Sequence, residues 1–282
     1  MRFLGEKSRM SISIVTWTLG LTAAQDVINK AQALGLDGIQ YAGDHRDVDP
    51  IQLRNSAIQS GLEVIAVDPF NAGPTDPSTA SAAGAVAYYK RVIDFAEILG
   101  TVPVTLQGLS LWTKNCDNRN DAKDQLLTCC EAVNRYAHER GVRTLYEVCN
   151  HYEVPLIHTA QECRELIEAV GEGNMGMILD SFHMNINEQD PLQAIRANLD
   201  LLEIYHISDS GRGGIGTGHI NFRTHHRTLL EGGFAGHVAI EPVLAHLTPS
   251  NSPRFADDQA QLDAQIYHSA SCWRSYSNDL PE

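Results

Sequence analysis

The sequence lacks the features that mark nucleic-acid-binding and membrane proteins. Its 21 Lys and Arg residues form no basic run and are outnumbered by 35 Asp and Glu residues, which gives a formal net charge of −14. A phosphate backbone would meet repulsion from such a surface, so we expect no nucleic-acid partner. No apolar stretch reaches the roughly 20 residues that span a bilayer, so we expect no membrane partner either. Low-complexity segments are also absent, which favours a folded globular chain.

The sequence also lacks the cysteine spacing that marks metal-binding or disulfide-forming pairs. The six cysteines show no Cys-x-x-Cys motif and no regular spacing, which is typical of reduced, mostly buried thiols. Near the N-terminus, basic residues precede an apolar run at positions 12–24 that loosely resembles a secretory signal, but Ser and Thr residues interrupt it. A strand followed by a helix explains the same residues. We therefore expect a cytoplasmic protein with a short N-terminal extension at residues 1–10.

The chain does contain a regular alternation of short β-branched runs and longer amphipathic segments, which predicts βα units and a parallel sheet. Eight strands are expected, at Ser11–Trp17, Gly38–Tyr41, Glu63–Asp68, Val102–Leu106, Arg143–Glu147, Met175–Asp180, Leu202–Ile207 and Gly236–Glu241. Eight helices are expected, at Ala23–Leu34, Ile51–Ser60, Ala82–Leu99, Lys123–Arg140, Ala160–Val170, Leu192–Asn198, Thr224–Leu230 and Gln259–Ser271. Because about 250 residues suffice for such a fold, we predict a single-domain (β/α)8 TIM barrel over residues 11–282.

Glycines mark the ends of several predicted helices, and irregular stretches connect some of the strands to the helices that follow. Five predicted helices end in a glycine just before the next strand, as left-handed C-caps require: Gly35, Gly61, Gly100, Gly141 and Gly171. The longest irregular stretches follow the third, fourth and seventh strands, at residues 69–79, 107–120 and 208–221. In a barrel these loops lie on the face where the strands end, so we predict that they form the walls of a substrate site.

Four candidate metal ligands stand at the ends of four successive strands in the second half of the chain. Glu147, Asp180 and Glu241 close the fifth, sixth and eighth strands, and His206 lies near the end of the seventh. A parallel barrel delivers these positions to one face, so the four side chains should converge. Two Glu, one Asp and one His form an oxygen-rich donor set that suits Mn²⁺, Mg²⁺ or Co²⁺ better than a structural zinc. The sequence therefore predicts a metalloenzyme, with His183 close by because it follows Asp180 by three residues.

Three segments give the chain a resemblance to a known family. They are Glu147-Val-Cys-Asn-His-Tyr-Glu153, Leu179-Asp-Ser-Phe-His-Met-Asn-Ile186 and Gly236-His-Val-Ala-Ile-Glu241. They resemble the ketose 3-epimerases, including D-tagatose, D-psicose and L-ribulose 3-epimerases, of the xylose-isomerase-like TIM barrel group in the sugar phosphate isomerase/epimerase superfamily. The resemblance is strong from the fifth strand to the end of the chain and holds only in outline for the first half.

The resemblance implies roles for individual residues. It makes four residues the ligands of a divalent metal, with Mn²⁺ foremost: Glu147, Asp180, His206 and Glu241. It makes Glu147 and Glu241 the catalytic acid/base pair as well. It also implies contacts with a small-molecule sugar substrate from Glu153, His183, Arg212 and Trp112. A homo-oligomer, either a dimer or a tetramer, is implied too.

The chemistry of C3 epimerisation fits this donor set. Removing the weakly acidic proton beside a ketone becomes feasible when a metal polarises the carbonyl and holds the enediolate oxygens. Two carboxylates on opposite faces of that planar intermediate can invert the carbon, because one takes the proton and the other returns it. The glycine-rich loop at 210–219 lacks the Lys of a phosphate-binding loop, and no other loop clusters basic residues. We therefore expect an unphosphorylated sugar.

Three other kinds of protein share parts of this pattern. The same barrel and ligands also resemble inosose isomerases or dehydratases, enzymes that act on 3-oxo-glycosides, and hydroxypyruvate isomerases, which the fold alone cannot separate. A DNA-repair endonuclease of the endonuclease IV type shares the four positions but needs further histidines from the first strands, and no His occurs between His45 and His138. A non-catalytic sugar-binding barrel would not need carboxylates on both flanks of a metal.

Overall fold

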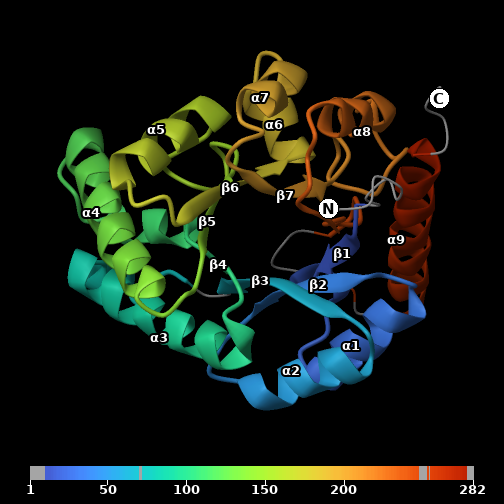
Figure 1. Cartoon of the computed structure of the whole chain (residues 1–282), viewed down its shortest axis with the longest axis horizontal. Coiled ribbons are helices and arrows are strands. Elements are labelled where there is room, and N and C mark those ends of the chain that lie inside the picture. Colours follow the sequence, from blue (N-terminus) through green and yellow to red (C-terminus); the bar gives the residue numbers. More distant parts are fainter. Residues whose placement is uncertain (1–9, 70–71, 248–252, 254, 278–282) are drawn as a thin grey trace, which may run out of the picture.

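Eight parallel strands close into a barrel in sequence order, and helices surround it (Figure 1). The computed structural model describes residues 10–69, 72–247, 253 and 255–277. Its strands are β1 (Ile12–Val15), β2 (Gly38–Gly43), β3 (Glu63–Pro69), β4 (Val104–Thr105), β5 (Thr144–Val148), β6 (Met175–Asp180), β7 (Leu202–Ile207) and β8 (His237–Ile240). Pairing of β1 with both β2 and β8 closes the ring. The predicted single-domain TIM barrel is confirmed.

All eight predicted helices are present; α5 has the predicted bounds, and the other seven have shifted ends. The α-helices of the described residues are α1 (Ala24–Ala33), α2 (Pro50–Gln59), α3 (Ala82–Gly100), α4 (Arg119–His138), α5 (Ala160–Val170), α6 (Ser181–Asn187), α7 (Pro191–Ala197), α8 (Phe222–Glu231) and α9 (Ala256–Tyr276). Three 3₁₀ helices are η1 (Thr16–Leu19), η2 (Pro77–Thr79) and η3 (Gln107–Thr113). None of the helices in the described ranges has both the length and the apolar character needed to cross a membrane.

The first, fourth and eighth strands are shorter than predicted, and β8 ends at Ile240, directly before Glu241. The chain leaves β1 after Val15, because the Thr18 hydroxyl turns back to donate to the Val15 carbonyl and the Thr16 hydroxyl accepts from the Ala42 amide of β2. Trp17 therefore lies in η1 and not in a strand. In β4 the ladder begins only after Pro103, which has no N–H to donate.

Besides η1 and η2, the helices η3 and α6 on the strand-end face were not predicted. The stretch at 107–120, expected to be irregular, holds η3 and the first turn of α4. The short helix α6 begins directly after β6, because the Asp180 side chain accepts hydrogen bonds from the backbone N–H groups of Phe182 and His183 at 2.6 and 3.0 Å. An Asp at this position is a strong N-cap. Of the predicted N-terminal extension, residues 1–9 lie outside the described residues.

Left-handed residues end most of the helices where glycines predicted them. Four of the five glycines have φ values of 66–70°: Gly35, Gly61, Gly141 and Gly171. At the end of α3 the left-handed C-cap is Thr101, with φ of 59°, one residue after the predicted Gly100. A β-branched residue reaches this conformation less readily than glycine, so no sequence pattern marks Thr101 as a cap.

The interior of the barrel is a small apolar cluster, separate from the main core, formed by Val15, Ala42, Ile65, Ala66, Leu145, Ile178, Ile204 and Ala239. Successive side chains of a strand point to opposite faces, so a residue two positions further on also faces the barrel axis. Each candidate ligand follows an interior residue in this way, in the pairs Leu145/Glu147, Ile178/Asp180, Ile204/His206 and Ala239/Glu241. The pleat of the strands therefore aims all four ligands at the axis.

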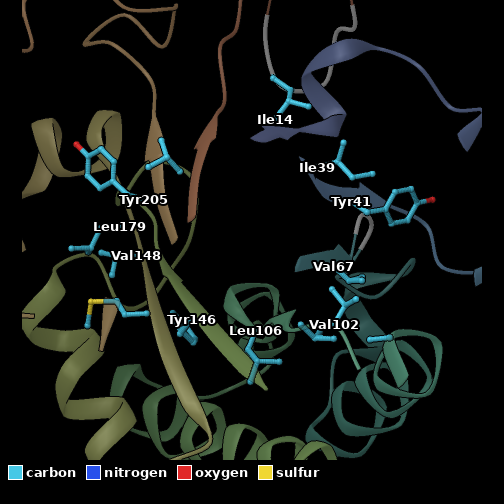
Figure 2. Packing of buried hydrophobic residues seen from close by; sticks show 14 of the residues in the cluster. Ile14, Ile39, Tyr41, Val67, Val102, Leu106, Tyr146, Val148, Leu179 and Tyr205 are labelled. Carbon is cyan, nitrogen blue, oxygen red and sulfur yellow. The ribbon is translucent and has the colours of Figure 1, made fainter. Parts of the chain in front are cut away.

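The main core lies between the strands and the surrounding helices. Figure 2 shows part of it, with Ile14 and Ile39 from β1 and β2 and Leu179 and Tyr205 from β6 and β7. These residues alternate with the interior ones, and most are fully buried. The barrel wall is thus packed on both sides, which fixes the positions of the strand ends.

Candidate metal centre and active site

Glu147, Asp180, His206 and Glu241 converge at the ends of β5 to β8. One ligand atom from each lies within 4.8 Å of every other, and all four side chains are buried. The Nδ1 atom of His206 is 3.2 Å from Glu147 Oε1, 3.5 Å from Glu241 Oε2 and 3.9 Å from Asp180 Oδ2. The structure therefore brings together the four residues that the sequence singled out.

His206 is held so that Nδ1 faces the carboxylates. Its other ring nitrogen, Nε2, donates a hydrogen bond of 2.8 Å to Oε1 of Gln40 on β2. Because Nε2 carries the proton, the neutral ring keeps a lone pair on Nδ1 for a ligand. A hydrogen bond that fixes the tautomer in this way is the usual partner of a metal-bound histidine.

The three acidic groups lie close together in a site shielded from water. Burial raises the pKa of Glu147 to about 7, although His206 acts in the opposite direction. Burial raises the pKa of Asp180 well above its ordinary value, and repulsion from Glu241 adds to this. Burial opposes protonation of His206, but Glu147 and Glu241 outweigh it and raise the pKa of the ring. The cluster thus attracts positive charge, either a proton or a cation.

A divalent cation fits the donors of this cluster. The buried oxygens Asp180 Oδ2 and Glu241 Oε2 have no hydrogen-bond partner among the described residues. Such atoms are costly unless a donor or a cation engages them. Three carboxylates and one imidazole form the hard donor set that Mn²⁺, Mg²⁺ or Co²⁺ accepts.

A second group of polar side chains lies beside the cluster. Asn150 Nδ2 donates to His183 Nδ1 at 2.7 Å and to Glu153 Oε1 at 3.1 Å, and Glu153 Oε1 also accepts from Arg212. Burial, with the charge of Arg212 adding to it, lowers the pKa of His183 to about 3. The ring is therefore neutral, and its proton sits on Nε2, which is 4.0 Å from Glu147 Oε1. His183 can donate a hydrogen bond to an oxygen bound at the cluster.

Arg212 projects into the site from the loop after β7. Its backbone has φ of 64°, and its carbonyl accepts from the Val243 amide at 2.6 Å. The guanidinium carbon lies 5.0 Å from the centre of the Phe182 ring and 5.7 Å from that of Trp17. Burial opposes the charge of Arg212, but the surrounding carboxylates, Glu241 first, outweigh it and raise its pKa. Arg212 is thus a fixed positive charge at the rim of the acidic cluster.

A cavity of about 310 Å³ opens above the cluster. Its lining includes Glu147, Glu153, His183, Arg212 and Glu241. Trp112, predicted to contact the sugar, does not line this cavity. It is 8% exposed in η3, donates to the Ala72 carbonyl and lines a neighbouring hollow beside Tyr88. Among the described residues, Trp17 is the Phe, Tyr or Trp side chain that lines the cavity, and it donates to Glu241 Oε1 at 2.7 Å.

Sequence reasoning missed several residues of this site: Trp17, Gln40, Asp68, Gln107, Cys149 and Asn150. Gln107 Nε2 donates to Glu147 Oε2 at 3.1 Å and to Asp68 Oδ1 at 3.0 Å. A signal for Gln40 and Asp68 was available, because Gln40 precedes the interior Ala42 by two positions and Asp68 follows the interior Ala66 by two. Gln107 lies outside any strand, so no periodicity marks it.

Fold and site together define a (β/α)8 barrel with an acidic, cation-attracting centre at its C-terminal face, the face that carries activity in such barrels. The chain belongs to the xylose isomerase-like TIM barrel family, whose model matches residues 28–265. The predicted family is confirmed.

Curated relatives of the chain are sugar epimerases. A D-psicose 3-epimerase of Ruminiclostridium cellulolyticum is 29% identical over 270 residues, which are 90% of this chain and 85% of the relative. A ketose 3-epimerase of Arthrobacter globiformis is 34% identical over 105 residues, and the match spans only 37% of this chain and 36% of the relative. A 3-dehydro-D-guloside 4-epimerase of Escherichia coli is 29% identical over 43% of this chain and 47% of its own.

The fold of an L-ribulose 3-epimerase structure is similar as well. It has a TM-score of 0.81 at 24% sequence identity and covers 96% of both chains. At this identity the likeness establishes the fold, and the site must be argued from its own residues.

Proposed function

We propose that this protein is a metal-dependent sugar epimerase that inverts C3 of a free, unphosphorylated ketose. The observation that carries the proposal is the placement of Glu147 and Glu241. Glu147 lies on β5 and Glu241 directly follows β8, and both approach the same atom, Nδ1 of His206, at 3.2 and 3.5 Å. Two carboxylates that flank one centre from different strands provide an acid and a base on two sides of a bound substrate.

The metal would be held by Glu147, Asp180, His206 and Glu241, with Mn²⁺ as our first choice. When bound, it lowers the barrier by polarising the ketone and stabilising the oxygens of the enediolate. One glutamate takes the C3 proton, and the C–H electron pair moves into the enediolate. The other glutamate delivers a proton to the opposite face of C3. The two glutamates exchange these tasks when the reaction runs in reverse.

Substrate orientation is assigned to three residues beside the cluster. His183 offers its Nε2 proton to a developing oxyanion, and Arg212 offers a fixed positive charge nearby. Glu153 is bound by Asn150 and Arg212, which orients its carboxylate to accept a hydrogen bond from a sugar hydroxyl. One arginine tied to a carboxylate favours hydroxyl groups over a phosphate dianion.

Solvent exchange tests the proposal directly. A panel of psicose, fructose, tagatose and ribulose is incubated with the Mn²⁺-loaded protein in D₂O, and proton NMR follows C3. We expect deuterium to enter at C3 of at least one ketose together with its C3 epimer. Exchange at another carbon, or no exchange in any ketose, would reject C3 epimerisation of free ketoses.

A second candidate is an isomerase, dehydratase or lyase that acts on a 3-oxo-glycoside or an inosose with the same metal and acid/base residues. The similarity to the 3-dehydro-D-guloside 4-epimerase favours it over a nuclease or a non-catalytic barrel. Turnover of a 3-oxo-glycoside without turnover of any ketose would identify this candidate. The three-metal nuclease gains no support, since residues beside the axis on β2 and β3 are Gln40 and Asp68 and not histidines.

A further inference from the structure

The cavity above the metal cluster has two unlike halves. The residues of β5 to β8 and their loops form the reactive half, with the proposed metal ligands, His183, Glu153 and Arg212. The other half comes from β1 to β4 and the loops after them. In the closed order of eight strands, β3 stands opposite β7, and Figure 1 shows the two on opposite sides of the barrel. A substrate whose C3 lies at the cluster must extend its remaining carbons into this second half.

Asp68 is the exception in an otherwise uncharged surface. The second half is lined mainly by Trp17, Ala72, Gly73, Leu111 and the Gln107 amide. Among the described lining residues of this half, Asp68 alone has an ionisable side chain. Burial raises the pKa of Asp68, while hydrogen bonds from Thr105 and Gln107 act in the opposite direction. An acid in such a place requires a reason, because an unsolvated carboxylate is costly.

The carboxylate of Asp68 is fixed on one side and free on the other. Its Oδ1 accepts from the Thr105 hydroxyl at 2.6 Å and from Gln107 Nε2 at 3.0 Å. Its Oδ2 has no hydrogen-bond partner within the ranges that the structure describes, and the residue lines the cavity. Gln107 also donates to Glu147, so one amide sets the distance between Asp68 and the metal cluster. Oδ2 is therefore an oriented acceptor that can take a hydrogen bond from a bound ligand.

We propose that Asp68 is the specificity-determining residue for the end of the sugar remote from the metal. Its Oδ2 accepts a hydrogen bond from a hydroxyl on the carbons beyond C3, and its negative charge repels a phosphate or carboxylate at that position. The preferred substrate class is thus a polyhydroxy ketone with an unmodified tail. This inference rests on the proposed function, because it takes C3 to lie at the cluster.

The charges around the cavity support the exclusion of anionic tails. The carboxylates of Asp68, Glu147, Glu153, Asp180 and Glu241 face one arginine in the cavity and its floor. A divalent metal and Arg212 would leave this set of groups negative. Like charges placed together in a shielded site are strongly unfavourable, so an added phosphate would weaken binding.

The assignment is tested by combining a change in the protein, at Asp68, with a change in the sugar, at its C6 hydroxyl. The ketohexose turned over best, its 6-deoxy analogue and its 6-phosphate are compared on the Mn²⁺-loaded wild type, Asp68→Ala and Asp68→Asn. The control is Asp117→Ala, because Asp117 is exposed and has no hydrogen bond within the described residues. In the wild type, loss of the hydroxyl should lower kcat/KM about 10- to 100-fold, as for a hydrogen bond to a charged group. In Asp68→Ala that penalty should largely vanish, whereas the control should keep it.

The charge is tested by the 6-phosphate. Asp68→Asn should narrow the preference for the free sugar over the phosphate about tenfold or more. Metal affinity, measured by titration of Mn²⁺, should stay within a factor of about three in both variants, because Asp68 is no ligand. Equal penalties in wild type and Asp68→Ala would overturn the inference, and so would loss of metal binding in Asp68→Ala.

Failure of the proposed function is distinguishable from failure of this inference. If no ketose is turned over, the same cycle is measured as equilibrium binding of the ketohexose that binds most tightly, its 6-deoxy analogue and its 6-phosphate. Binding is followed by calorimetric titration. A hydroxyl-dependent Kd that disappears in Asp68→Ala would keep the subsite while the epimerase proposal is abandoned. Equal Kd values, or no binding at all, would overturn both.

Discussion

The indole N–H of Trp17 donates a hydrogen bond of 2.7 Å to Oε1 of Glu241. This contact crosses the seam where β1 closes the barrel against β8. It restrains one carboxylate oxygen of a proposed catalytic glutamate, while the ring of the same tryptophan lines the cavity. The first residues after β1 therefore help to orient a group at the end of β8.

Trp17→Phe keeps an aromatic wall but removes this donor together with part of the ring. We expect kcat to fall about tenfold, as for loss of one hydrogen bond to a charged group, with a smaller change in KM. Steady-state kinetics on the best ketose measure both constants. Trp112→Phe is the comparison, and it also tests the sequence prediction that Trp112 contacts the sugar. An unchanged kcat in Trp17→Phe would show that this hydrogen bond does not assist catalysis.

Gln40→Leu should weaken metal binding without removing a ligand. The change leaves His206 Nε2 without its acceptor, so the ring no longer favours the tautomer with a free Nδ1. Loss of such a partner typically lowers metal affinity about 10- to 100-fold. Calorimetric titration with Mn²⁺ measures it, and Gln52→Leu on the exposed side of α2 is the control. Equal affinities in wild type and Gln40→Leu would contradict the assigned role.

Removal of metal should abolish activity, and Mn²⁺ or Co²⁺ should restore it. A metal held only by the folded chain also stabilises that chain, by about 2.7 kcal/mol at one hundred times its Kd. Dialysis against a chelator, readdition and thermal unfolding measure both effects. Full activity in protein shown to be metal-free by elemental analysis would refute the proposed role of the four-residue cluster.

Glu147→Gln and Glu241→Gln should each lower kcat by about 10² to 10⁴, the usual contribution of a general acid or base. The barrel should stay folded, since both amides keep the shape of the acid. Turnover and circular dichroism are measured on both, with Glu165→Gln on the exposed face of α5 as control. A variant with more than about a tenth of the wild-type kcat would contradict the two-carboxylate mechanism.

Stability should fall at mildly acidic pH in part because of a buried histidine on α8, His225. Burial lowers the pKa of His225 from 6.5 to about 4 in the folded chain. Between these values the unfolded chain binds more protons, so the free energy of unfolding decreases as the pH falls from 6.5 towards 4. The part of this loss that comes from His225 is about 3 kcal/mol, at about 1.36 kcal/mol per pKa unit.

The residue-specific part of this loss is measured by urea unfolding at several pH values. His225→Gln should flatten the dependence, and His138→Gln, at an exposed position of α4, should not. A wild-type slope that persists in His225→Gln would assign the effect to other groups.

The sequence predicted best what periodicity and chain order determine. Strands β6 and β7 have the predicted bounds, and the four proposed ligands converge because the pleat points alternate residues to the axis. Elsewhere the predicted bounds were wrong because of local side-chain hydrogen bonds. Side-chain hydrogen bonds of Thr16 and Thr18 end β1 early, and the Asp180 side chain begins an unpredicted helix.

The hydrogen-bond partners of the site residues could not be predicted from the sequence, for a different reason. Gln107 meets Asp68 and Glu147 across three strands, and Asn150 meets His183 across 33 positions. Such contacts depend on barrel closure and on loop paths that no local pattern records. The same holds for Trp112, whose neighbours Ala72 and Tyr88 come from other parts of the chain.

Each strand of the barrel, or the segment directly after it, places a residue at the site or beside it. None of the described residues at the opposite rim of the barrel lines the cavity. The turns that lead from α1 to β2 and from α2 to β3, around Gly35 and Gly61, contribute no residue to the four-residue cluster or to the lining of the cavity above it. New chain ends could therefore be opened in those turns by circular permutation. Such permutants would change the order of the strands along the chain but keep the arrangement of the side chains around the cavity.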